Sequence, residues 1–164
     1  MTRTLLIVWH SRTGAARQMA RAAADAAARE AGVTVRLVPA AEANAADLLA
    51  ADGYLFCAPE NLASLSGEMK AFFDRAYYPA LDRLQGRPYA LMVAAGSDGH
   101  GVVRQVARIA TGWRLRAVAE PLVVHTHAQT PETIQAEKTV PPADLQRCAD
   151  LGQALAAGLA LGVF

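Results

Sequence analysis

The sequence predicts an α/β protein in which a parallel β-sheet carries helices on both faces. Short apolar runs rich in β-branched residues alternate along the chain with longer alanine-rich segments typical of helices. Such an alternation gives parallel strands joined by right-handed crossovers. Hydrophobic residues make up 53% of the 164 residues, which favours a packed globule over a disordered chain. At this length we expect one domain over residues 1–164.

The N-terminal third shows the pattern most clearly. Residues Thr4–Trp9 read TLLIVW, a continuous apolar run expected of a strand covered on both faces. The small and polar residues Ser11–Ala15 end that strand. Residues Ala16–Ala31 then predict a long helix ended by Gly32, and Val33–Val38 predict the second strand.

The rest of the chain repeats the alternation. In chain order, the sequence predicts a short helix at Asp47–Ala51, a strand at Gly53–Ala58, a loop at Pro59–Ser66, a helix at Gly67–Leu84, a strand at Tyr89–Ala95, a glycine-rich loop, a helix at Val102–Thr111, a strand at Ala117–Val124, an irregular stretch at Thr126–Pro142 and a helix at Ala143–Leu161. The irregular stretch is long enough to suggest a role at a site or a subunit contact.

Charge and cysteine content exclude several classes of protein. Sixteen basic and fifteen acidic residues leave a net charge near +1, so the composition gives no sign of a basic surface that would bind nucleic acid or an anionic membrane. No apolar run reaches the roughly 18 residues that span a bilayer. Cys57 and Cys148 form no C-x-x-C pair, so no zinc site or redox dithiol is indicated. With two cysteines and no secretory signal, we expect a cytoplasmic protein.

Three turns of unusual composition follow predicted strands, at residues 10–16, 58–66 and 96–101. In an open parallel sheet, ligands bind outside the carboxyl ends of the strands, where the strand order reverses. All three turns should lie on that same edge of the sheet. The sequence therefore predicts one ligand site built from them.

The first turn has the chemistry of an anion site. It leads into a predicted helix N-terminus, where free backbone N–H groups and the helix dipole favour a negative charge. Ser11 and Thr13 add hydroxyl donors, Gly14 permits close approach of the backbone, and Arg12 adds a positive charge. A phosphate monoester fits these features. The alternative is that Thr13 only caps the helix and Gly14 only makes the turn. The turn matches neither G-x-x-x-x-G-K-[ST] nor G-x-G-x-x-G.

Sequence motifs at the three turns resemble known flavoproteins. The segment VWHSRTGAARQMA resembles the phosphate loop of flavodoxins and their multimeric reductase relatives. The segment CAPENLASLSGEMKAFFDR looks like the second flavin loop of NAD(P)H-dependent FMN reductases and of quinone reductases of the tryptophan-repressor-binding-protein type. The third loop, residues 95–101, is similar to the loop that covers the other side of the isoalloxazine. The matching positions of the second loop are Pro59, Ser66, Gly67, Met69, Lys70, Phe72, Asp74 and Arg75.

The resemblance spans residues 4 to about 125. It implies a flavodoxin-like three-layer sandwich with a five-stranded parallel sheet in the order 2-1-3-4-5, and FMN as cofactor. It also implies three groups of cofactor-binding residues: Ser11, Arg12, Thr13, Gly14, Ala15 and Ala16 at the phosphate, Pro59, Glu60, Asn61, Leu62 and Ala63 along the ring edge, and Gly96, Ser97, Asp98 and Gly99 on the opposite side.

This chain departs from the family pattern in two places. Ala16 stands where many flavodoxins have a threonine, so one hydroxyl contact with the phosphate is missing. Neither flavin loop offers a tryptophan or tyrosine to stack on the ring. A flavin would then be more open, held weakly, or covered by a partner subunit.

Several single residues have more than one interpretation. His100 is a weak candidate for protonating a reduced flavin or a quinone, and the alternative is a solvated loop histidine. Cys57 is expected to be a buried core cysteine, because a C-x₅-R phosphatase loop needs arginine where Ala63 stands. His125 and His127 lack a carboxylate at ligand spacing, so we expect no metal. No residue is assigned a firm catalytic role.

The leading functional hypothesis is an FMN-dependent oxidoreductase that transfers electrons from NAD(P)H to a quinone or another small acceptor. The alternative is an electron-transfer flavodoxin, although such carriers usually present a strongly acidic surface that this chain lacks. A third reading is a non-redox module that has lost its flavin.

The resemblance also implies a possible homodimer or homotetramer. The aromatic pairs Phe72-Phe73 and Tyr77-Tyr78, together with Trp113, are candidates for the subunit contact. The alternative is that these residues fill the core of one chain.

Overall fold

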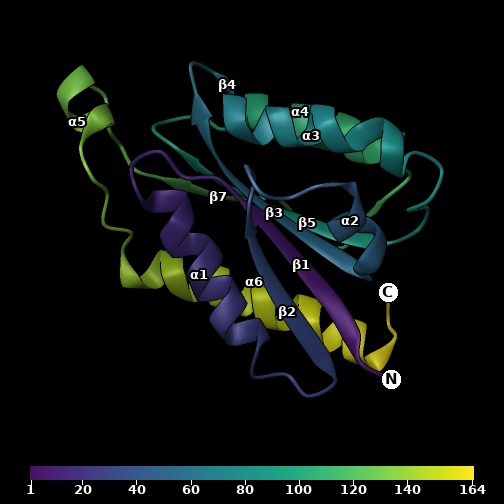
Figure 1. The fold of residues 1–164 in the computed structure, drawn as a ribbon. Coiled ribbons are helices and arrows are strands. Elements are labelled where there is room, and N and C mark those ends of the chain that lie inside the picture. Colours follow the sequence, from purple (N-terminus) through teal and green to yellow (C-terminus); the bar gives the residue numbers. More distant parts are fainter.

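A central parallel sheet lies between two layers of helices in the computed structural model, which describes residues 1–164 (Figure 1). The strands of the parallel sheet are β1 (Arg3–Trp9), β2 (Val33–Pro39), β3 (Gly53–Asn61), β5 (Pro88–Ala95), β6 (Arg116–Ala117) and β7 (Leu122–His125). Their order across the sheet is β2-β1-β3-β5, and both β6 and β7 pair with β5 on its free side. With β5 counted as the fourth parallel strand and β6 and β7 together as the fifth, the order is the predicted 2-1-3-4-5, which confirms the flavodoxin-like fold.

The fifth position of the sheet is divided between two strands, whereas the sequence predicts one strand over Ala117–Val124. Strand β6 pairs with the first residues of β5, and β7 pairs with its last four. Pro121 lies in the break between them. Proline has no N–H to donate to a sheet and restricts the residue before it, so the strand is interrupted there.

Two helices cover one face of the sheet and three cover the other (Figure 1). The helices are α1 (Ala15–Ala27), α2 (Ala45–Ala50), α3 (Gly67–Ala80), α4 (His100–Gly112), α5 (Pro131–Gln135) and α6 (Pro142–Leu161). Helices α1 and α6 pack on one face, and α2, α3 and α4 pack on the opposite face. The short helix α5 stands away from both layers, beyond the end of β7 (Figure 1).

Alternate residues of the central strands enter the two cores. In β1, Leu5 and Ile7 pack with α1 and α6, while Leu6 and Val8 pack on the side of α3. All four side chains are fully buried. This follows from the two-residue period of a strand, and it explains why β1 is apolar throughout.

Several predicted boundaries are wrong, and three of them matter for the fold. Helix α1 ends at Ala27 instead of Ala31, and α3 ends at Ala80 instead of Leu84, where Pro79 occupies the last turn and Asp82 takes a positive φ of 61°. Residues Pro59–Ser66 are not wholly a loop, because β3 runs on to Asn61 and forms a hairpin with β4 (Ser64–Leu65).

The stretch Thr126–Pro142 is not wholly irregular either, since it contains α5. The Thr130 hydroxyl accepts a hydrogen bond from the N–H of Thr133, and Pro131 occupies the first helical position. Both features are local start signals of a helix.

Most of the aromatic residues considered for a subunit contact fill the core instead. Phe72, Phe73 and Trp113 are buried together under α3 and α4. The Trp113 indole N–H donates to the carbonyl oxygen of Tyr77 at 3.0 Å. Only Tyr78 is largely exposed. None of the helices combines the length and the apolar character needed to cross a membrane.

Candidate functional site

A cavity of about 640 Å³ opens at the carboxyl ends of β1, β3, β5 and β7. Its size lies within the range of small-molecule sites. Eleven of the fifteen predicted cofactor-binding residues line it: Ser11, Arg12, Thr13, Ala15, Ala16, Pro59, Glu60, Asn61, Leu62, Gly96 and Ser97. The other four, Gly14, Ala63, Asp98 and Gly99, lie in the same three loops but not in the cavity wall.

The first loop joins β1 to α1 and ends in a left-handed glycine. Gly14 precedes the first helical residue with φ of +99°, and its N–H donates to the Ser11 hydroxyl at 3.1 Å. Thr13 does not cap the helix, so that reading of the sequence is wrong. Ala15 and Ala16 bring the first turn of α1 to the cavity wall, where unpaired N–H groups and the helix dipole favour an anion.

The second loop is the hairpin between β3 and β4. Its two turn residues, Leu62 and Ala63, have φ of +51° and +64°, a combination typical of a type I′ turn. Neither residue is glycine or asparagine, which such turns prefer. Leu62 is completely exposed at the rim of the cavity. Behind the turn, the Gln105 side chain accepts from the Leu65 N–H at 2.7 Å and donates to the Ser64 hydroxyl at 2.9 Å.

The third loop is fixed to the second by a hydrogen bond and by a close backbone contact. The Glu60 carboxylate accepts from the N–H of Gly99, the residue before α4, at 2.8 Å, and Gly99 has a φ of +100°. Gly101 lies so close to the carbonyl oxygen of Ala63 that a side chain there would collide with it. The two loops therefore form one rigid wall.

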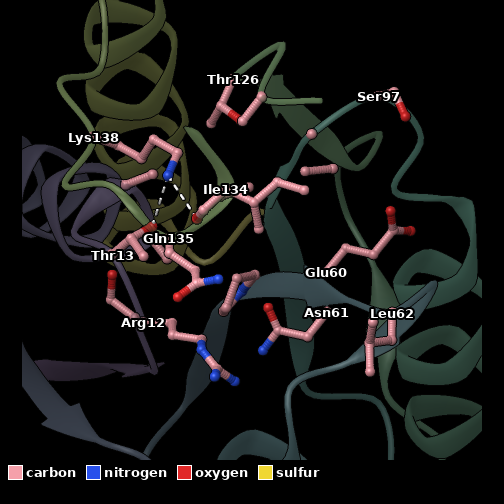
Figure 2. A pocket seen from close by; sticks show the side chains of 18 of the residues that line it. Arg12, Thr13, Glu60, Asn61, Leu62, Ser97, Thr126, Ile134, Gln135 and Lys138 are labelled. Carbon is pink, nitrogen blue, oxygen red and sulfur yellow. Dashed lines mark hydrogen bonds between the residues drawn. The ribbon is translucent and has the colours of Figure 1, made fainter. Parts of the chain in front are cut away.

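Sequence reasoning missed the part of the wall that follows β7. Thr126, Ala128, Gln129, Ile134, Gln135 and Lys138 line the cavity, as do Ala94 and Ala95 at the end of β5. Figure 2 shows Thr126, Ile134, Gln135 and Lys138 in this part of the wall. The length of this stretch suggested a functional role, but nothing in its composition pointed to particular residues. In Figure 2 the Lys138 side chain extends between Thr13 and Ile134.

The three histidines considered from the sequence, His100, His125 and His127, lie outside the cavity wall. His100 is exposed, and its ring lies against the Asp98 carboxylate. This hydrogen bond is the main reason that the pKa of Asp98 is lowered. His125 contacts the Asp98 carbonyl oxygen at 3.0 Å. No three histidine, cysteine, aspartate or glutamate side chains are grouped to hold a metal ion.

Two further titratable side chains, those of His10 and Cys57, do not line the cavity. His10 contacts the buried Ser66 hydroxyl through Nδ1 at 2.9 Å, and burial is the main cause that lowers its pKa. Cys57 is fully buried and donates to the Ala16 carbonyl oxygen at 3.3 Å. Burial raises the pKa of the Cys57 thiol well above its usual range. Cys57 is therefore a core residue, as expected.

Comparison with known proteins connects this arrangement to redox proteins. A family model described as NADPH-dependent FMN reductase matches residues 38–130, which include the second and third loops. A flavodoxin of Aquifex aeolicus is 32% identical over 97 residues, which are 59% of this chain and 52% of the flavodoxin. The chain thus matches about half the length of this curated relative.

Solved flavodoxins share the whole fold. Oxidised flavodoxin 1 from Bacillus cereus superimposes with a TM-score of 0.75 at 19% identity, covering 94% of this chain and 97% of that one. A WrbA-like flavodoxin from Agrobacterium tumefaciens superimposes with a TM-score of 0.67 at 20% identity, covering 98% and 99%. At these identities the likeness establishes the fold.

Proposed function

Because this chain belongs to the NADPH-dependent FMN reductase family, we propose that it is a flavin-binding redox protein that holds FMN in the cavity described above. The observation that carries the proposal is the meeting of three loops on one cavity with a cationic end and a wall of small residues. The phosphate of FMN would lie against the first turn of α1, where Ser11, Thr13 and Arg12 line the cavity. The ring would lie between the hairpin of β3 and β4 and the loop at Gly96 and Ser97.

The residues of this chain would act mainly by binding and orienting. FMN supplies the redox chemistry when it is bound. The Ser11 and Thr13 hydroxyls and the N-terminal turn of α1 would hold the phosphate. The rigid wall fixed by Glu60 and Gly99 would set the orientation of the ring. No side chain of the cavity is needed as a proton donor for a hydride to reach the ring.

The finer activity that we propose is electron transfer from NAD(P)H to a quinone or another small acceptor. The family description supports NADPH as donor. The nearly balanced charge of the chain also favours an enzyme for small molecules over a carrier steered to a basic protein. No aromatic side chain lines the cavity, which leaves room for a second planar molecule beside the ring.

An electron-transfer flavodoxin is the second candidate, and one observation favours it. The curated relative from Aquifex aeolicus and the solved structures above carry the name flavodoxin. Turnover separates the two functions. Protein loaded with FMN should oxidise NADPH or NADH many times over when a benzoquinone is present. If neither nicotinamide reduces the bound flavin while a separate flavodoxin reductase does, the carrier function replaces the enzyme.

Flavin binding itself is tested by titrating the purified chain with FMN and following the quenching of flavin fluorescence. We expect saturable binding that Ser11→Ala combined with Thr13→Ala weakens at least about tenfold, because hydrogen bonds to a charged group are each worth about 1.5–3 kcal/mol. Thr2→Ala removes an exposed hydroxyl at the opposite end of β1 and is the matched control. No binding of FMN by the wild-type chain would refute the proposed function.

A further inference from the structure

The cavity wall includes a segment that neither the sequence motifs nor the family match assigns to a flavin. This segment, residues 130–140, is called the strap below. All of it but residue 130 lies beyond the residues 38–130 that match the family. It nevertheless reaches the phosphate loop, where Lys138 contacts Thr13, a residue 125 positions earlier in the chain.

The backbone of the strap is fixed to the phosphate loop independently of the lysine side chain. The Lys138 N–H donates to the Thr13 carbonyl oxygen at 2.8 Å. The Gln18 side chain donates to the carbonyl oxygens of Lys138 at 2.7 Å and of Gly14 at 3.1 Å. It also accepts from the Val140 N–H at 2.9 Å. Removing the ammonium group therefore leaves the strap tethered.

The ammonium group of Lys138 is held at the cavity by oxygens on two sides (Figure 2). Two of its N–H groups donate to carbonyl oxygens within the strap, that of Ile134 at 2.9 Å and that of Ala136. Its third contact is the Thr13 hydroxyl, at a longer 3.3 Å. Because the Thr13 oxygen accepts this hydrogen bond, its own O–H remains available to donate to an anion in the cavity.

The positive charge of Lys138 is not neutralised within the protein. The neighbouring Arg17 pairs with Glu137 at 3.2 Å. Lys138 and Arg12, which both line the cavity, take part in no ion pair. Two unpaired cations thus lie at the end of the cavity where the first turn of α1 begins. A phosphate monoester carries a charge between about −1.5 and −2 at pH 7, which matches them.

We propose that Lys138 makes the site selective for a phosphorylated flavin over the same flavin without its phosphate. This rests on the proposed function, since the anion is the phosphate of the bound FMN. Arg12 is exposed and long, so its position is weakly restrained, whereas the half-buried residue Lys138 has its ammonium group held by two carbonyl oxygens. A fixed point charge loses little entropy when the phosphate arrives, and it contributes nothing to a neutral ribityl chain.

The test compares the affinities of FMN and riboflavin, measured by fluorescence quenching at low salt. Lys138→Met keeps the aliphatic stem and removes the charge. It should weaken FMN binding about tenfold, because it removes the electrostatic attraction between a fixed positive charge and the phosphate, and leave riboflavin binding unchanged. Lys138→Arg should restore part of the preference for FMN. The control is Lys70→Met, which removes the chain's other lysine, paired with Asp74 on the exposed face of α3.

Each result of this comparison decides the proposal. An equal loss of affinity for FMN and riboflavin in Lys138→Met would overturn it and give Lys138 a purely structural role. FMN binding by the wild-type chain would still support the proposed function. An unchanged FMN affinity in Lys138→Met would overturn it as well. Failure of the wild-type chain to bind either flavin would overturn the proposed function and this inference together.

Discussion

The Glu60 carboxylate and the Gly99 N–H join two loops that lie 39 residues apart, through a hydrogen bond of 2.8 Å. Glu60 lies in β3 just after its pairing with β5 ends and where the hairpin with β4 begins, and Gly99 is the residue before α4. An acidic group at a helix N-terminus is stabilised by the unpaired N–H groups and by the helix dipole. This one contact therefore stabilises α4 and also sets the distance between the two loops that flank the cavity.

Two substitutions of Glu60 distinguish the contribution of its negative charge to stability from the contribution of its hydrogen-bond acceptor. Glu60→Ala removes both and should lower the free energy of unfolding by about 1–2 kcal/mol, since it leaves the Gly99 N–H without its partner. Glu60→Gln keeps a neutral acceptor and should lose about half as much. Urea denaturation measures both values. Equal stability of Glu60→Ala and the wild-type protein would show that the contact does not hold the loops together.

The hairpin turn at Leu62 and Ala63 should be stabilised by glycine. Ala63 has φ of +64°, and the left-handed region costs a residue with a Cβ about 1–2 kcal/mol. Ala63→Gly should therefore raise the free energy of unfolding by about 0.5–1 kcal/mol, after the entropy cost of glycine is subtracted. The control is Ala154→Gly at an exposed position within α6, which should lower it by about 1 kcal/mol. Changes of the same sign would refute the strain at this turn.

Gly14 is expected to resist any side chain, for two separable reasons. Its φ of +99° is unfavourable for other residues, and a Cβ would also force the exposed Glu137 carboxylate of the strap to move aside, at a smaller cost. Gly14→Ala should lower both stability and FMN affinity. Adding Glu137→Ala removes this crowding but not the backbone strain, so the double variant should recover only part of the loss. Full recovery would mean that the left-handed conformation of Gly14 is not required.

His10 should make stability depend on pH near neutrality. Burial is the main cause that lowers its pKa below the ordinary 6.5, the nearby Glu68 opposes this, and Arg12 adds to it. The unfolded chain therefore binds the proton at a higher pH than the folded chain. Stability is complete above about pH 6.5 and falls as the pH decreases through the folded pKa.

His10→Asn tests this pH dependence. Its side-chain amide can keep the contact with the Ser66 hydroxyl but cannot take up the proton. The melting temperature of the wild-type protein should drop more steeply between pH 7 and pH 5 than that of His10→Asn. Parallel curves for the two proteins would contradict the assignment.

The fold and three of the four cavity walls could be predicted because their signals are local. The apolar run of β1, the small residues before α1 and the glycines before α4 each stand within a few positions of one another in the sequence. The hairpin was missed because Leu62 and Ala63 are not the residues that a type I′ turn prefers. Lys138 was missed for a different reason: its partner Thr13 lies at the other end of the chain, and no periodic pattern connects them.

The most direct test of the central claim is a ¹H–¹⁵N NMR titration of the labelled chain with FMN. The account predicts saturable shifts at the amides of residues 11–16, 60–63, 96–99 and 126–138, with few changes elsewhere. Together these segments surround the one cavity at the carboxyl ends of the strands. An absence of shifts, or shifts centred on the opposite edge of the sheet around Arg3 and Asp52, would contradict it.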